Sequence, residues 1–275
     1  MASTESESKR RRISLEESRP QPSVVVSSSP TGVHPADDPA AVSVVAPKLD
    51  EIPQLLFVEL HKDRPESVVE ALKRISDLFL VQDDNNKHDP AIKNWEKTHY
   101  LGPISFVVVT MNKWSTNHDV QLWSCGALCN LLSVKKSSTA MLSMAKSGGV
   151  EAVIGAMKTF PQSDDLQMDA CMALGNTFFN VTKRHKIVQD CAARFVEELE
   201  GVALMLGVMK QFPDDEELLN NCCWLFDSLA TCFPQHHGMF IDAGVVEVVA
   251  SVQKRYSGNE TLKQATKEFM STMFS

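Results

Sequence analysis

The sequence predicts an all-α protein in which helical repeats stack into an α-solenoid. An eighteen-residue segment occurs three times, beginning at Met111, Met157 and Met209, and each copy shares six positions with the next without a gap. Apolar residues recur in and around the copies at helical spacing, and short glycine-terminated segments lie between them. A helical period of roughly 40–50 residues is typical of such a stack, because one helical pair cannot bury its apolar face alone.

Residues 1–47 are predicted to form a disordered tail, and residues 48–275 the repeat domain. The tail is rich in Ser, Pro and charged residues, and its apolar runs are too short to offset the entropy of ordering the chain. Its basic run Lys9–Arg12 precedes Ser14, a candidate phosphorylation site for basophilic kinases. The same run resembles a short nuclear-import signal, and a solvated charge run is the alternative to both readings.

The longer helix that opens each repeat is indicated by apolar residues at i, i+3, i+4 and i+7. A looser copy begins the series with Ile52, Leu55 and Leu56. Four full sets follow: Ile104, Val107, Val108, Met111; Val150, Val153, Ile154, Met157; Val202, Met205, Leu206, Met209; and Val245, Val248, Val249, Val252.

A second long helix follows a polar or proline-containing break, with buried positions expected at 0, +4, +7, +8 and +11. The three clear sets are Val120, Ser124, Ala127, Leu128, Leu131; Leu166, Ala170, Ala173, Leu174, Thr177; and Leu218, Cys222, Leu225, Phe226, Leu229. Looser sets begin at Val68 and Leu262. The small residues at +4 would allow neighbouring helices to approach closely.

A shorter helix ending in glycine precedes each repeat, as in "MLSMAKSGG", "CAARFVEELEG", "MFIDAG" and, more divergently, "IKNWEKTHYLG". Glycine supplies the left-handed conformation that ends a helix. Each unit is therefore expected to contain a short helix, a glycine and two long helices, called here the first, second and third helix.

This order of helices and glycines resembles that of the armadillo repeat family. "GGVEAVIGAM" looks like its glycine and second helix, and "VQLWSCGALCN" and "LQMDACMALGN" look like its third helix. The resemblance covers roughly residues 49–275, or about four to five repeats. It implies a right-handed armadillo-type α-solenoid whose third helices line a concave groove, and a non-enzymatic role in binding proteins.

No catalytic residues, cofactor or metal site are predicted. The acidic pairs Asp164-Asp165 and Glu216-Glu217 recur at the start of third helices, where they favour the positive end of the helix dipole. Cys223, Cys232 and His236 lack a familiar zinc spacing. The odd number of cysteines and their helical positions favour a reduced compartment, either cytoplasm or nucleus. The net charge of −8 does not suggest a nucleic-acid partner, and no stretch suggests a membrane span.

The candidate partner-binding residues lie at +3, +6 and +10 of the third helices, on the face next to the buried stripe. They are Trp123, Gly126 and Asn130; Asp169, Met172 and Asn176; and Asn221, Trp224 and Ser228. Asparagine amides could clamp an extended backbone, and Trp offers a flat wall for lysine or arginine stems. The structural alternatives are local helix-end hydrogen bonds for Asn130 and Asn176, and packing against the next repeat for Trp123 and Trp224.

The predicted function is a protein-interaction scaffold or adaptor that binds a protein segment in this groove. The resemblance to importin alpha suggests a nuclear-transport adaptor as one alternative, but that pattern pairs a Trp with an Asn four residues later and no repeat here has both. A metal-dependent or catalytic repeat protein is a second alternative, and Lys9–Arg12 as an internal competitor is a third. Phe269, Met270 and Phe274 suggest an incompletely capped C-terminal end that could self-associate.

Overall fold

The computed structural model describes residues 63–79, 102–133, 138–179 and 185–275. The predictions for the tail 1–47, for Ser14, for the apolar set that begins at Ile52 and for most of "IKNWEKTHYLG" lie outside these residues. The described residues form helices and turns with no strand, which confirms the all-α prediction.

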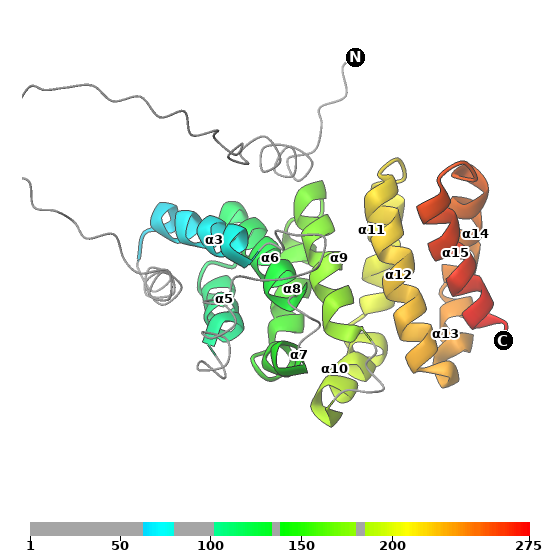
Figure 1. Ribbon diagram of the computed structural model, residues 1–275, viewed down its shortest axis with the longest axis horizontal. Coiled ribbons are helices and arrows are strands. Elements are labelled where there is room, and N and C mark those ends of the chain that lie inside the picture. Colours follow the sequence, from blue (N-terminus) through cyan, green and yellow to red (C-terminus); the bar gives the residue numbers. More distant parts are fainter. Residues whose placement is uncertain (1–62, 80–101, 134–137, 180–184) are drawn as a thin grey trace, which may run out of the picture. The chain divides into compact units, whose positions relative to one another are not determined.

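The helices follow the predicted order of first, second and third helix (Figure 1). The third helices are α3 (Pro65–Phe79), α6 (His118–Ser133), α9 (Asp164–Phe178), α12 (Glu216–Cys232) and α15 (Glu260–Met273). The second helices are α5 (Gly102–Lys113), α8 (Gly149–Thr159), α11 (Gly201–Gln211) and α14 (Val245–Arg255). The first helices are α7 (Ser138–Lys146), α10 (Lys186–Glu197) and α13 (His237–Asp242), the last preceded by the 3-10 turn η3 (Pro234–His236).

The third helices pack on one another in chain order, from α3 through α6, α9 and α12 to α15. Every position predicted as buried in α6, α9 and α12 is buried. The small residues at +4, namely Ser124, Ala170, Cys222 and Thr266, are fully enclosed. The predicted armadillo-type stack of third helices is therefore confirmed over the described repeats.

The predicted apolar sets of the second helices are fully buried in α5, α8 and α11, whereas α14 departs from its set. Val248 is only partly buried, while Val245, Val249 and Val252 lie in the core. The helix α14 begins at Val245 itself, but α8 and α11 each begin one residue before their sets. Val248 stands four residues after the left-handed Gly244, as the partly buried Ala152 stands four residues after Gly148 in α8.

The left-handed residues before the second helices are Gly148 (φ 74°), Glu200 (φ 57°) and Gly244 (φ 83°). The prediction that glycine always takes this conformation is therefore wrong for the third copy, where Gly201 is the first residue of α11. Gly201 has a different role, since a Cβ there would lie 2.5 Å from the buried ring of Phe195. The glycine permits close packing, and Glu200 carries the backbone strain.

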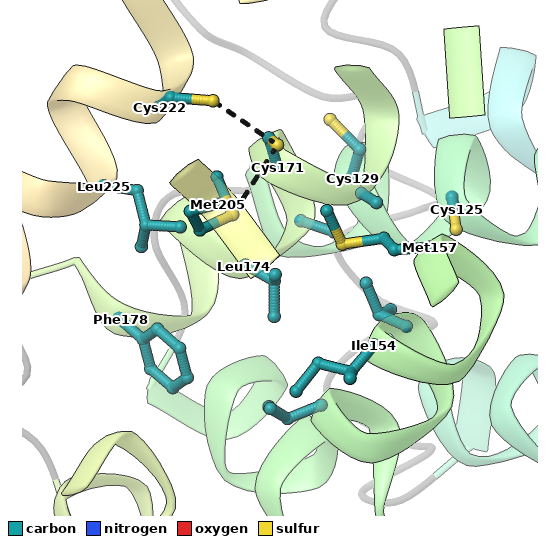
Figure 2. Close-up of a cluster of buried hydrophobic side chains, with 14 of the residues drawn as sticks. Cys125, Cys129, Ile154, Met157, Cys171, Leu174, Phe178, Met205, Cys222 and Leu225 are labelled. Carbon is teal, nitrogen blue, oxygen red and sulfur yellow. Dashed lines mark hydrogen bonds between the residues drawn. The ribbon is translucent and has the colours of Figure 1, made fainter. Parts of the chain in front are cut away.

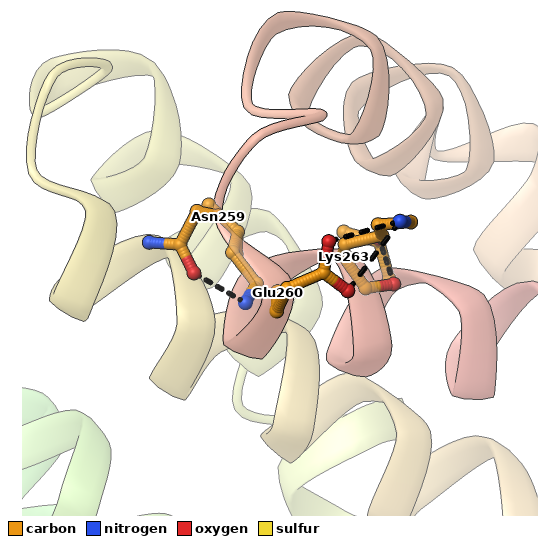
Figure 3. A network of polar contacts seen from close by, with 5 residues as sticks. Asn259, Glu260 and Lys263 are labelled. Carbon is orange, nitrogen blue, oxygen red and sulfur yellow. Dashed lines mark hydrogen bonds and ion pairs between the residues drawn. The ribbon is translucent and has the colours of Figure 1, made fainter.

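Side-chain caps begin the third helices α6, α12 and α15, whereas Ser163 makes no such bond at the start of α9. The carboxylate of Asp215 accepts a hydrogen bond from the amide of Leu218. The side chain of Asn259, labelled in Figure 3, accepts one from the amide of Leu262. The acidic pairs lie in the first turns of α9 and α12, as expected for charges that complement the helix dipole.

One glutamine on α6 and one on α9 tie these third helices to the second helices before them. The Nε2 group of Gln121 donates to the carbonyls of Met111 and Trp114, at 2.9 and 3.0 Å. Gln167 makes the equivalent bonds in the next repeat. These contacts satisfy carbonyls at the end of a helix that would otherwise lack partners.

Sulfur-containing side chains fill the interface between α9 and α12 (Figure 2). The thiol of Cys171 lies 3.9 Å from both the Met205 and the Cys222 sulfur atoms. All seven cysteines are free thiols. Burial raises the pKa of Cys125 and of Cys223, and a hydrogen bond between Cys222 and Cys171, together with burial, raises that of Cys222. These groups therefore act as packed apolar side chains rather than as reactive thiols.

The exposed surface of the C-terminal helix α15 is more polar than we expected from the sequence. Phe269 is fully buried and Met270 partly buried, which corrects the expectation that both contribute to an exposed apolar end. Phe269 packs against Phe226 of α12, with ring centroids 6.1 Å apart. Phe274 is 65% exposed. The other exposed residues of the helix are polar, among them Lys263, Gln264, Lys267, Glu268 and Ser271.

We predict that Gly201→Ala lowers the free energy of unfolding by about 1–3 kcal/mol, because the added methyl group overlaps the enclosed Phe195 ring. Gly207→Ala, in the same helix, is the matched control, since no atom lies within 4 Å of its built Cβ. It should be neutral or stabilising by up to about 1 kcal/mol. Urea denaturation of both variants measures the difference, and equal stability would contradict the packing role of Gly201.

Candidate partner-binding surface

The eight residues predicted to bind a partner lie on three consecutive third helices and are all partly buried. We call them the third-helix surface: Trp123, Asn130, Asp169, Met172, Asn176, Asn221, Trp224 and Ser228. Gly126, the ninth residue of the pattern, is buried. Since α6 packs on α9 and α9 on α12, equivalent positions follow one another from repeat to repeat.

The asparagines of this surface join neighbouring third helices. The Nδ2 group of Asn130 donates to the carbonyl and to the hydroxyl of Ser76 on α3, both at 2.9 Å. Asn176 donates to the carbonyl of Cys129 on α6 at 3.2 Å, and Asn221 lies 3.0 Å from the Met168 sulfur. These bonds reach the preceding repeat, so they are not local helix-end contacts.

The two tryptophans also contact the preceding third helix. The ring of Trp224 stacks on Phe179, with centroids 5.8 Å apart and planes 25° apart. It lies so close to α9 that a Cβ on Gly175 would approach it to 2.5 Å. The ammonium group of Lys73 lies 5.0 Å from the centre of the Trp123 ring. The two tryptophans therefore pack on the preceding repeat, whereas the alternative drawn from the sequence had them pack on the next one.

Asp169 lies close to the preceding helix. A Cβ on Gly126 would come within 2.9 Å of its carboxylate, so the missing side chain at Gly126 makes room for Asp169. Burial raises the pKa of the neighbouring Cys125, and the carboxylate of Asp169 adds to that effect. Met172 packs partly against the core.

Negative charge accumulates on the same three helices. The sequences of α6, α9 and α12 contain seven Asp or Glu residues and no Lys or Arg. Asp119, Asp165 and Glu217 stand four residues before Trp123, Asp169 and Asn221. Asp119 is exposed and Glu217 partly buried, whereas Asp165 is buried. Sequence reasoning assigned the pairs at 164–165 and 216–217 to capping alone, although the four-residue spacing also sets one member of each about one helical turn before Asp169 and Asn221.

Asp227 connects α12 to the last helix. Its carboxylate accepts a hydrogen bond of 2.7 Å from the Thr272 hydroxyl on α15. Burial raises the pKa of Asp227, the charge of Glu268 raises it further, and the hydrogen bond from Thr272 acts in the opposite direction. Asp227 thus links two third helices, as Asn130 and Asn176 do, but its side chain is a charged acceptor rather than an amide donor.

No group of three or more His, Cys, Asp or Glu side chains is arranged to hold a metal ion within the residues that the structure describes. Among the described helices, none has the length and apolar character needed to cross a bilayer. The candidate site is therefore a set of polar and aromatic side chains at equivalent positions of the three packed helices α6, α9 and α12.

A family model described as the LRRK2 ARM repeat matches residues 102–273, which is more than half of the chain. The chain belongs to the armadillo repeat family. Its predicted resemblance to that family is therefore confirmed, together with the armadillo-type solenoid fold.

Three similar proteins accompany this match. The Protein aardvark of Dictyostelium discoideum is 31% identical over 139 residues, which span 50% of this chain and 18% of that protein. Crystal structures of two engineered proteins from the Northeast Structural Genomics Consortium each align with 81% of this chain. One has a TM-score of 0.63 at 19% identity over 48% of its own length, and the other has 0.54 at 16% over 96%. These structures support the fold alone.

We predict that Asp227→Asn increases stability at neutral pH, by less than about 1 kcal/mol because the side chain is only half-buried and solvent screens its charge. The folded state raises the pKa, so ionised Asp227 disfavours folding above that pKa and the penalty disappears as the pH falls through it. The advantage of the variant should therefore shrink on acidification. Denaturant unfolding at several pH values measures it, with the exposed Asp242→Asn as control; a pH-independent difference would contradict the assignment.

Proposed function

We propose that this chain is a non-enzymatic interaction scaffold or adaptor, and that it binds a segment of a partner protein along the third-helix surface. Armadillo repeats typically bind proteins, and the family is generally non-catalytic. The observation that carries the proposal is the recurrence of partly exposed polar and aromatic side chains at equivalent positions of α6, α9 and α12. A single continuous segment can contact all three helices because they pack side by side.

The bound segment is proposed to be extended and to lie in a concave groove. Packed helices lie roughly 8–10 Å apart. An extended chain advances roughly 3.3 Å per residue, so about three residues of the partner would pass each repeat. The flat rings of Trp123 and Trp224 would contact its apolar stems, and the amide oxygens of Asn130 and Asn176 would accept from its backbone N–H groups.

The adaptor of importin-alpha type receives no support from the side-chain geometry. Trp224 stacks on Phe179, and the position four residues after it is Ser228 rather than an asparagine. Asn130 and Asn176 likewise follow Gly126 and Met172. We place the protein in the cytoplasm or the nucleus, because its seven cysteines are all free thiols and would remain reduced there.

We predict that Met172→Arg with Ser228→Arg abolishes capture of the groove partners. Both side chains are partly exposed on the third-helix surface, and two long arginines would fill the space above α9 and α12 and alter its charge. Asn130 and Trp224 are unsuitable targets, since removing them would also break contacts between repeats. Quantitative pull-down mass spectrometry of full-length proteins measures the partners retained.

The matched control is Met239→Arg with Ser251→Arg, which places the same substitutions on α13 and α14, outside the third-helix surface. Circular dichroism and melting curves must first show that both double variants retain the wild-type fold. Partners lost from the first variant and kept by the second are the groove partners. A partner list that is unchanged in the first variant would exclude this surface as the binding site.

A further inference from the structure

We propose that Ser257, in the turn between α14 and α15, is a phosphorylation site for a basophilic serine kinase, and that its phosphate competes with Asp214 for the side chain of Arg255. The inference goes beyond the proposed function and does not depend on the third-helix surface. It rests on the residues before Ser257, on the exposure of the turn and on the contacts that Arg255 makes with the preceding repeat.

Three serines of the chain follow the same pattern of cations. Each has an arginine two residues before it and a second Lys or Arg three residues before it. The segments are RRIS, KRIS and KRYS, which end at Ser14, Ser76 and Ser257. Kinases select substrates by such charge patterns, because carboxylates in the kinase cleft pair with the cations of the substrate. The pattern alone therefore does not choose among the three serines.

The structure distinguishes Ser76 from Ser257, whereas Ser14 lies outside the described residues. Ser76 stands inside α3, is 8% exposed, and its hydroxyl accepts a hydrogen bond of 2.9 Å from Asn130. Ser257 is exposed in the turn at residues 256–258. A kinase binds the segment that it phosphorylates in an extended form, which an exposed turn can adopt and the interior of a packed helix cannot. Of this pair, Ser257 is the accessible serine.

The equivalent turn after α5 has the same geometry without the paired cations. Ser115 lies two residues after the last residue of α5, as Ser257 lies two residues after the last residue of α14, and both serines are exposed. The residue three positions before Ser115 is Asn112, so one cation, Lys113, precedes this serine instead of two. Ser115 is therefore a control for exposure, and Ser76 is a control for sequence.

The reaction transfers one phosphoryl group. The hydroxyl oxygen of Ser257 forms a bond to the γ-phosphorus of the MgATP held by the kinase, the bond from that phosphorus to the bridging oxygen breaks, and ADP leaves. The hydroxyl proton passes to the catalytic aspartate of the kinase. The phosphoserine carries a charge of about −1.5 to −2 at neutral pH and three strong acceptor oxygens.

Arg255 holds this turn against the preceding repeat. Its guanidinium group donates to the carbonyl of Pro213 at 3.3 Å and forms an ion pair with the carboxylate of Asp214. The hydroxyl of Tyr256 donates to the same Pro213 carbonyl at 2.8 Å. A phosphate on Ser257, two residues further along the chain, would offer the same guanidinium group a bidentate acceptor.

The surroundings of the turn are acidic. Burial raises the pKa of Tyr256, the charge of Arg255 lowers it, and three carboxylates raise it, those of Asp214, Glu216 and Asp215. A phosphate placed beside these carboxylates would repel them. It should therefore draw Arg255 away from Asp214 and loosen the contact between this turn and the one at residues 212–215.

The first test phosphorylates the full-length chain carrying Ser14→Ala with the catalytic subunit of cyclic-AMP-dependent protein kinase and ATP. Mass spectrometry then follows each phosphoserine over time. Ser257 should be phosphorylated at least about tenfold faster than Ser76 or Ser115, and Arg255→Gln should slow its phosphorylation by about tenfold or more. Absence of phosphate from Ser257, or an equal rate at Ser76 or Ser115, would overturn the assignment.

The second test measures the competition for Arg255. Asp214→Asn leaves the guanidinium group free for the kinase, so the initial rate of Ser257 phosphorylation should rise by about twofold or more. Asp242→Asn removes an exposed acid on α13 and should leave that rate unchanged. Equal rates in the two variants would contradict the competition, and circular dichroism verifies that both remain folded.

Hydrogen exchange detects the loosened contact in the phosphorylated protein. Amides of residues 212–215 should exchange about threefold faster or more after phosphorylation of Ser257, because the turn loses its contacts with Arg255. Amides of the equivalent turn at residues 160–163, one repeat earlier, should exchange at an unchanged rate. Exchange that is unchanged in both turns would show that the phosphate does not displace Arg255 from Asp214.

Discussion

The close packing of each third helix on the one before it is the contact on which the rest of the structure depends. Its small, fully enclosed residues at the +4 position, from Ser124 to Thr266, let the helices approach. Gly126 makes room for Asp169, and Gly175 for the ring of Trp224. A helix packed in this way on both sides, as α9 is between α6 and α12, can expose only a narrow strip to solvent. The candidate binding surface is that strip.

The side chains of this strip also join neighbouring third helices. Asn130 and Asn176 donate hydrogen bonds from their amide nitrogens to the preceding third helix. Trp224 covers Gly175 and Phe179 with part of its ring and leaves part exposed. Substitutions of Asn130, Asn176 or Trp224 would therefore disturb contacts between repeats as well as the surface they occupy.

Most of the fold could be predicted from the sequence, because helical periodicity and glycine position are local signals. Every predicted core position of α6, α9 and α12 is buried, and the helices follow the predicted order. The exceptions depend on how helices meet. They are the left-handed Glu200, which precedes a glycine needed for packing on Phe195, and the partly buried Val248 of α14. The partial exposure of the candidate residues on these helices could likewise be predicted from their positions. The hydrogen-bond partners of Asn130 and Asn176 could not be predicted, because they lie 54 and 47 residues away in the chain.

The most direct test of a binding surface on α6, α9 and α12 is hydroxyl-radical footprinting of the full-length chain with and without a captured partner. We expect labelling of Trp123, Met172 and Trp224 to fall on binding. Labelling of Ile187, Ile241 and Phe274, exposed on α10, on α13 and after α15, should stay unchanged. Protection of these three residues, with unaltered labelling of Trp123, Met172 and Trp224, would place the partner on another face and contradict the central claim.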